Sequence, residues 1–120
     1  MIPKYEEIML PLLKYLSDGE EHGLSETHDA LAKYFRLSDQ AQRELLPSGK
    51  QPVFRNRLGW ARTYMKKAGL IVSSRRAYFK ITTLGLELLE ENPADINAQF
   101  LTRYEDFVKP GFKFQVQQVN

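Results

Sequence analysis

The residues of this sequence best suited to chemistry are basic, and several of them fall on one face of a predicted helix. The segment FRNRLGWARTYMKKA, residues 54–68, has helical periodicity, and at about 100° per residue Arg55, Arg62 and Lys66 form one stripe. The remaining exposed side contains no acid and consists of Asn56, Gly59, Thr63 and Lys67. Cationic side chains bind anions, and arginine and asparagine also form paired hydrogen bonds with the edges of guanine and adenine. We therefore predict that this face contacts a polyanion.

The charge distribution along the chain supports the same interpretation. Between positions 45 and 86 the sequence contains nine Lys or Arg residues and no Asp or Glu. All fifteen acids therefore lie in the two flanks, together with the other eight of the 17 basic residues. A solvated surface normally mixes both signs, so this segregation favours a face built for a polyanion. The alternative is that folding distributes the nine charges over several faces.

Length and composition narrow the class of protein. A chain of 120 residues is long enough for one core, and the absence of cysteine leaves no disulfide or thiolate metal site. No apolar run approaches the ~20 residues of a membrane span, and the N-terminus carries acids instead of a basic leader. We therefore expect a soluble cytoplasmic protein without cofactor or metal, built as one domain over residues 1–108 with a tail at 109–120. His22 and His28 are six residues apart without a third ligand, and we expect both at the surface.

Apolar spacing predicts three helices before the basic segment. The first covers residues 2–16, and Pro11 inside it predicts either a kink or a helix start near that proline. The second begins with Ser25 as its N-cap. The residues expected on its buried side are Ala30, Leu31, Tyr34 and Phe35. The third is short, spans about 39–46, and ends at a turn rich in proline and glycine.

The basic helix should end at Gly69, because glycine adopts the left-handed conformation that commonly closes a helix. Its expected core face consists of Phe54, Leu58, Ala61, Met65 and Ala68. Trp60 and Tyr64 flank this face; they could stack on unpaired bases, but such a position is more typical of the core. Arg57 falls beside the apolar face, where it could pair with an acid of a neighbouring helix.

A change of period after the basic helix predicts a β-hairpin. Residues 70–72 and 77–82 are rich in β-branched and aromatic side chains, with a turn at 73–76 between them. The side chains expected to pack inward are Phe79 and Ile81. Arg75 and Arg76 would stand at the tip of the hairpin, where their alternative role is to protect a strand edge against pairing.

Two further elements are predicted near the C-terminus. Thr82 or Thr83 can cap a helix that ends at Asn92–Pro93, and residues 96–108 form an amphipathic segment at helical spacing. The tail FKFQVQQVN has strand-like alternation without an assignable partner. The acids of this end, which should face away from a polyanion, are Glu87, Glu90, Glu91, Asp95, Glu105 and Asp106.

This order of elements is that of a winged helix-turn-helix, a mainly α fold with a small β-hairpin. In such a domain the basic helix enters the major groove of double-stranded DNA, and the hairpin, or wing, lies on the backbone or in the minor groove. We therefore predict a DNA-binding site that consists of Lys50, Arg55, Asn56, Arg62, Thr63, Lys66, Lys67, Arg75 and Arg76.

The runs ELLPSGKQPVFRNRLGWARTYMKKAGLI and RRAYFKITTLGLELL resemble the N-terminal domain of Mrr-type restriction proteins. The resemblance extends from Ile2 to about Val108, and LPSG, NRLGWA and KKAGL are its most specific motifs. It implies a winged-helix DNA-binding module, which in that family precedes a PD-(D/E)xK nuclease domain that cuts DNA with modified bases. A role in restricting foreign or methylated DNA is what the resemblance implies for this chain.

The sequence departs from the nuclease part of that pattern. A nuclease domain needs about a hundred or more further residues, whereas this chain ends at Asn120, and no Lys has Glu or Gln two positions before it. We therefore expect a non-catalytic protein that binds DNA and does not cut it. The alternatives are a stand-alone transcription regulator, an enzyme, and a protein-interaction module. Such a module would form a homodimer or bind a nuclease partner through a C-terminal helix carrying Phe100, Tyr104 and Phe107.

Overall fold

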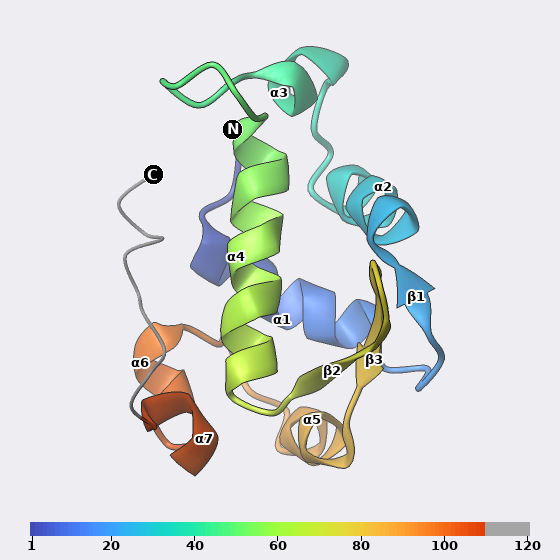
Figure 1. Ribbon diagram of the computed structural model, residues 1–120, viewed down its shortest axis with the longest axis vertical. Helices are drawn as coiled ribbons and strands as arrows, with labels where there is room; N and C mark the ends of the chain where they lie inside the picture. The colour runs from blue at the N-terminus through green and yellow to red at the C-terminus, as the bar shows by residue number, and fades with distance from the viewer. Residues whose placement is uncertain (110–120) are drawn as a thin grey trace.

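The three longest helices of the described chain surround one hydrophobic core. The computed structural model describes residues 1–109, so the alternation predicted for the tail beyond them lies outside the described residues. The elements in chain order are α1 (Tyr5–Tyr15), β1 (His22–Gly23), α2 (Leu24–Tyr34), α3 (Asp39–Arg43), α4 (Val53–Lys67), β2 (Ile71–Arg75), β3 (Tyr78–Ile81), α5 (Thr83–Glu90), α6 (Ala98–Leu101) and α7 (Glu105–Val108). Helix α4 runs along one side, α1 crosses behind it, and the β2–β3 hairpin lies beside its C-terminal half (Figure 1). The mainly α fold with a small antiparallel sheet is consistent with the predicted winged helix. None of the described helices is long and apolar enough to cross a membrane.

Helix α4 buries its apolar face in the core, as its periodicity predicts. The buried residues of this face are Phe54, Leu58, Ala61, Met65 and Ala68. Burying one large apolar side chain contributes about 1.5–3 kcal/mol, so this face accounts for much of the stability of α4. Tyr64 is buried as well and meets Tyr5 of α1 edge-on, with ring centroids 5.1 Å apart. Gly69 follows the helix with a φ of +84°, which confirms the predicted glycine stop.

Within residues 1–109 the sheet has three antiparallel strands in the order β1-β3-β2. Strand β2 pairs with β3 around a bulge between Ser73 and Arg75. The predicted turn at 73–76 is therefore too long, since β2 continues to Arg75 and the turn consists of Arg76 and Ala77. The bulge explains the difference, because one extra residue on β2 keeps the strands paired close to the tip. As predicted, the buried side chains of β3 are Phe79 and Ile81.

Helix α1 continues through its proline. It begins at Tyr5, so a helix start near Pro11 is the wrong alternative. An interior proline costs about 3 kcal/mol, because it removes a backbone hydrogen bond and crowds the preceding turn. Ile8 and Leu12, on either side of Pro11, are fully buried, and we infer that their packing offsets this cost.

The start and the end of α2 differ from the prediction. Gly23 is the N-cap residue, so Ser25 lies inside the first turn and is exposed. Glu26 takes over the capping role, because its Oε1 accepts a hydrogen bond from the Gly23 amide at 3.3 Å. Tyr34, expected to be buried, is 65% exposed and meets Phe35 edge-on. The partly buried Phe35 packs against the core at the end of the helix, which leaves Tyr34 outside.

Helix α3 starts as predicted and ends early. Ser38 caps it, because its Oγ accepts a hydrogen bond from the Ala41 amide at 3.0 Å. The helix stops at Arg43, three residues before the predicted end. Leu45 instead pairs with Pro52 in an isolated β-bridge, which closes a loop directly before α4.

The segment predicted as one amphipathic helix at 96–108 forms two helices of four residues each. Asn97 caps α6, and the break after α6 lets α7 turn back onto α4. Phe107 of α7 is only 2% exposed, and Phe100 and Tyr104 pack against the core. These three side chains therefore do not form the exposed anchor that the dimerisation alternative requires.

Thr82 joins three elements at the base of the wing. Its Oγ1 donates a hydrogen bond to the Gly69 carbonyl at 2.6 Å and accepts one from the Gly85 amide at 3.1 Å. This hydroxyl connects the end of α4 and the end of β3 to the start of α5, and it confirms the predicted cap. The wing is thereby held in a defined position relative to α4.

Candidate nucleic-acid interface

Helix α4 carries most of the predicted binding residues on its exposed side. Arg55 and Lys66 are exposed at opposite ends of this side. A shallow hollow of about 560 Å³ extends over the C-terminal half of α4 towards α7. The hollow is lined by Arg62, Thr63, Lys66, Lys67, Asp106 and Lys109. The structure thus brings four of the nine predicted residues together, on the helix that also carries Arg55 and Asn56.

One acid lies in this hollow against expectation. Asp106 was expected to face away from a polyanion, but α7 turns back onto α4 and places it beside the basic residues. A hydrogen bond from Lys109 lowers the pKa of Asp106, and the Lys109 Nζ and Asp106 Oδ1 atoms are 2.9 Å apart. Among the described residues the hollow still has a positive balance, because four cations line it together with this single acid.

Arg62 is half-buried, although its position on the helical wheel predicts a free side chain. Its guanidinium carbon lies 5.6 Å from the centre of the Phe79 ring on β3. Burial lowers the pKa of Arg62, and its Nε atom is covered and has no hydrogen-bond partner among residues 1–109. The side chain therefore lies between α4 and the wing, a contact that the helical periodicity cannot show.

The N-terminal end of the interface includes Asn56 and the loop before α4. The Asn56 Nδ2 atom donates a hydrogen bond to Gln51 Oε1 at 3.2 Å, and its Oδ1 is covered without a partner in the part of the chain that the structure describes. Lys50 is exposed in the loop, which turns at Gly49 with a φ of +73°. The loop that carries Lys50 leads into the start of α4, at the opposite end of the helix from the hollow (Figure 1).

The two arginines of the wing have different surroundings. Arg75 stacks on Tyr78, its partner across the hairpin, with the guanidinium carbon 3.8 Å from the ring centre. Its Nε and Nη2 atoms each lie 3.1 Å from Glu21 Oε1, just before β1. Hydrogen bonds from Ser74 and Arg75 lower the pKa of Glu21. Arg76 is exposed in the turn, so the wing offers one arginine paired with an acid and one at its tip.

Arg57 lies outside the interface. Its Nη1 donates hydrogen bonds to the carbonyls of Ile2 and Pro3, at 3.3 and 3.2 Å. Arg57 therefore binds backbone carbonyls of the segment before α1, where pairing with an acid of a neighbouring helix was expected. This contact fastens the N-terminus of the chain to α4.

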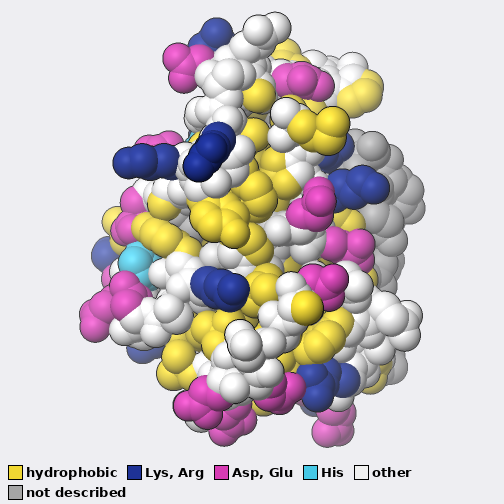
Figure 2. Space-filling model, turned by 180° about the vertical axis from the view of Figure 1, so that it is seen from behind, with side chains coloured by type: hydrophobic (Ala, Val, Ile, Leu, Met, Phe, Trp, Pro, Cys, Tyr) yellow, Lys and Arg dark blue, Asp and Glu magenta, His cyan; other side chains and the backbone are white. Residues whose placement is uncertain are grey.

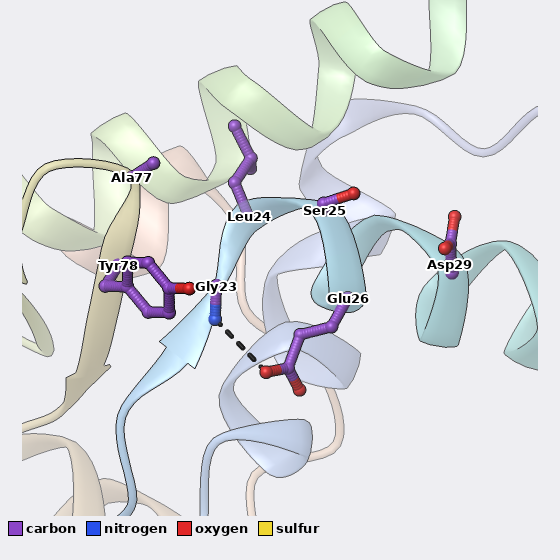
Figure 3. A pocket seen from close by; sticks show the side chains of 7 residues that line it. All are labelled: Gly23, Leu24, Ser25, Glu26, Asp29, Ala77 and Tyr78. Atoms are coloured by element: carbon purple, nitrogen blue, oxygen red, sulfur yellow. Dashed lines mark hydrogen bonds between the residues drawn. The ribbon is translucent and has the colours of Figure 1, made fainter.

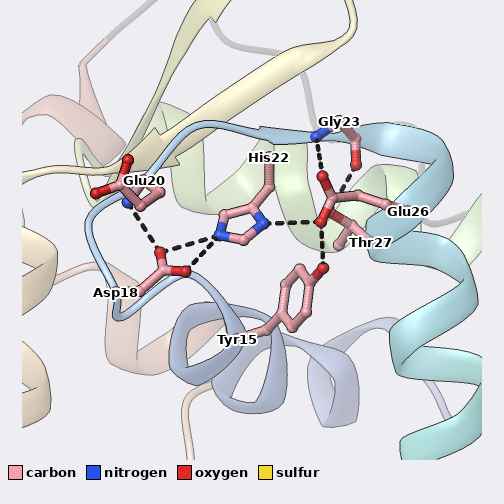
Figure 4. A network of polar contacts seen from close by, with 7 residues as sticks. All are labelled: Tyr15, Asp18, Glu20, His22, Gly23, Glu26 and Thr27. Atoms are coloured by element: carbon pink, nitrogen blue, oxygen red, sulfur yellow. Dashed lines mark hydrogen bonds and ion pairs between the residues drawn. The ribbon is translucent and has the colours of Figure 1, made fainter.

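A polar network around His22 holds β1, and with it the wing, against α1 and α2 (Figure 4). His22 Nε2 lies 2.9 Å from Asp18 Oδ1, and Nδ1 lies 2.9 Å from Glu26 Oε2. Burial lowers the pKa of His22, but hydrogen bonds to Glu26 and Asp18 outweigh it and raise that pKa above its ordinary value. Hydrogen bonds from His22, Tyr15 and the Gly23 amide lower the pKa of Glu26 to about 2. A doubly protonated ring can donate to both carboxylates.

Both histidines were expected at the surface, and both are only partly exposed. The side chains of His22 and His28 are each 12% exposed, and the His28 ring centre lies 5.3 Å from that of Phe54. The sequence does carry a signal for the His22 network, because Asp18 and Glu26 stand four residues before and after it. That spacing becomes informative only once a turn brings all three side chains to one place.

The His22 network predicts a loss of stability at high pH. A group whose pKa is raised by folding stabilises the folded state below its ordinary pKa of about 6.5, and this contribution disappears as the pH rises through the folded-state value. We expect Tm to fall as the pH rises above about 6.5 and this fall to be smaller in His22→Gln. Calorimetry at a series of pH values above about 6 measures Tm for both proteins. Equal slopes of Tm against pH for the original protein and His22→Gln would contradict the prediction.

A second hollow lies between the wing and the start of α2 (Figure 3). This hollow has a volume of about 450 Å³ and is lined by Gly23, Leu24, Ser25, Glu26, Asp29, Ala77 and Tyr78. Its charged residues are both acids, so it does not attract phosphate. Tyr78 packs closely on Gly23, where an added Cβ would lie 3.1 Å from the ring. The surface between the wing and the start of α2 is therefore acidic.

The face opposite α4 has a mixed character. Figure 2 shows acidic and basic side chains interspersed over this face, with acids gathered along the lower edge. Such a mixture is typical of a solvated surface and offers no continuous positive field. The exposed side of α4 is therefore the better candidate for binding a polyanion.

Comparison with known proteins identifies the family to which this chain belongs. The family model described as the Mrr N-terminal domain matches residues 5–91. Over 99 residues the chain is 31% identical to an Escherichia coli protein described as "Type IV methyl-directed restriction enzyme EcoKMrr". The alignment covers 82% of this chain and 32% of that relative, so the chain spans about a third of the relative's length. No solved structure matched the chain.

Proposed function

Because the chain belongs to the family of Mrr N-terminal domains, we propose that it is a non-catalytic module that binds double-stranded DNA. In this proposal α4 enters the major groove and the wing lies on the sugar-phosphate backbone. The observation that carries it is the exposed side of α4, which has cations from Arg55 to Lys67 and no acid of its own. A surface of this kind attracts a polyanion over several base pairs.

The dimensions and side chains of α4 fit a major groove. The helix has 15 residues, a length of about 22 Å, and the groove is about 12 Å wide. Arg55 and Lys66 are exposed at the two ends and suit phosphates on opposite sides of the groove. Asn56 and Thr63 lie between them and suit base edges. Arg76 at the tip of the wing can reach the sugar-phosphate backbone of the DNA. Arg75 is paired with Glu21 and must break this ion pair before it can bind a phosphate.

The domain covers residues 1–108 in this proposal and acts as the recognition part of a restriction system. The relative's name describes methyl-directed restriction, and this chain corresponds to about a third of that protein. We propose that cleavage belongs to a separate nuclease domain or partner. Binding assays on duplexes with and without methylated bases will measure whether this chain shares the methyl-directed behaviour.

Salt dependence tests the proposed binding mode. About five phosphate contacts would give a slope of about −4.5 in a plot of log affinity against log salt, because each contact releases counterions. We expect affinity for duplex DNA to fall about a hundredfold to a thousandfold between about 50 and 200 mM salt. Fluorescence anisotropy with a labelled duplex measures this. Absence of binding at the lower salt, or a flat response, would exclude the proposal.

A further inference from the structure

Gly59 lies in the middle of α4 without an internal reason for glycine. It has no left-handed backbone, because the glycines with positive φ in the described chain are Gly19, Gly49 and Gly69. A Cβ added at Gly59 would meet no atom of the described residues within 4 Å, so residues 1–109 leave room for a larger side chain there. Glycine in a helix interior is less stable than alanine. The protein thus keeps a destabilising residue that its own packing does not require.

The neighbours of Gly59 on the helix surface are the predicted DNA-binding residues. Arg55 and Thr63 lie four positions away on either side, and Asn56 and Arg62 lie three positions away. The missing side chain therefore leaves a gap in the centre of the polar face, with the helix backbone at its floor. A partner that approaches this face can come closer at Gly59 than at any of these four neighbours.

Two of these neighbours have incomplete hydrogen bonding. The Oδ1 of Asn56 and the Nε of Arg62 are both covered and without a partner in the described structure. Buried polar atoms are nearly always paired, because an unpaired one loses its hydrogen bonds to water. The third such atom among the described residues, Nε of Arg57, lies outside the interface, where Nη1 of the same side chain donates to the Ile2 and Pro3 carbonyls. Asn56 and Arg62, on either side of Gly59, thus have unused hydrogen-bonding capacity for a polar ligand once they rotate outward.

We propose that Gly59 is the point of closest approach between α4 and duplex DNA. The absence of a Cβ lets the edge of the groove lie against the helix backbone, while Asn56 and Arg62 on either side reach polar atoms of the duplex. This inference rests on the proposed DNA-binding function. It adds the register of the contact, meaning the position along α4 at which the duplex lies closest. That position is the middle turn of α4 and not the hollow beside α7.

The variants Gly59→Ala and Gly59→Leu test the register. Alanine should raise Tm by a few degrees, because it favours the helix and meets no neighbour. It should also weaken duplex binding about tenfold, and leucine should weaken it further, because each holds the groove away from the backbone. Gln99→Leu, which places a leucine on the exposed surface of α6, is the matched control and should bind like the original protein.

Two results would overturn the inference and can be told apart. If the original protein binds duplex DNA and Gly59→Ala binds equally well, the register is wrong and the proposed function stands. If the original protein does not bind at all, the proposed function fails and the inference fails with it. A higher Tm combined with weaker binding supports both, because a substitution that only damaged the fold would lower Tm.

Discussion

Replacing Arg55 and Lys66 together with glutamate is expected to weaken binding of duplex DNA by about a hundredfold or more and to leave the fold intact. Both side chains are exposed, so the change removes two cations from the DNA-facing side without disturbing the core. Each glutamate also adds a charge that phosphate repels. Anisotropy titrations at fixed salt measure the loss of affinity, and circular dichroism with thermal melting measures the fold.

The matched control reverses the charge of Lys14 and Lys33. These lysines are exposed on α1 and α2, and Lys14 lines a separate hollow with Glu6 and Glu7. The net charge changes by the same amount, but we expect at most a small loss of affinity. If the control weakens binding as much as the α4 variant, overall charge and not the α4 surface governs the interaction. The salt slope should also decrease in magnitude by about 2 in the α4 variant alone.

Gly85→Ala is expected to lower the free energy of unfolding by about 3 kcal/mol or more. A Cβ at this position would lie 2.4 Å from the Leu70 carbonyl oxygen and 2.6 Å from Ile81 Cγ1. The oxygen cannot easily move, because it accepts the Thr82 amide hydrogen bond at 3.0 Å. The added methyl group must therefore separate α5 from the base of the wing. Urea denaturation followed by circular dichroism measures the loss.

The same substitution at Gly59 serves as the control for helix propensity. Glycine to alanine makes the same chemical change in both helices, yet we expect opposite effects on stability, because only Gly85 lacks space for a methyl group. A Gly85→Ala protein as stable as the original would mean that α5 does not pack on Leu70 and Ile81 as described. It would also remove the reason for regarding the wing as held in place by α5.

The positions of α4 and the wing could be predicted from the sequence with good accuracy. The predicted helix at 54–68 is Val53–Lys67 in the structure, and each residue of its predicted core face is buried. The stop at Gly69 and the cap at Thr82 are confirmed as well. These features depend on neighbours three or four positions apart and on the backbone preferences of single residues, so local sequence contains the necessary information.

Features that depend on distant segments could not be predicted. The pairing of Arg75 with Glu21 joins residues 54 positions apart, and the contact of Arg62 with Phe79 joins α4 to β3. The two-residue strand β1 exists only because β3 lies beside it. The break between α6 and α7 follows from the packing of Phe107 on α4, where a continuous amphipathic helix was predicted.

The sequence alone therefore determined which side of α4 is apolar and which is basic, because an α-helix converts residue spacing directly into direction. The tertiary structure sets which cations remain available on that side. It half-buries Arg62, pairs Arg75 with an acid and brings Asp106 into the basic hollow. The physical reason is that the charge a ligand meets is the sum over all groups nearby in space, and most of those groups are far apart in the chain.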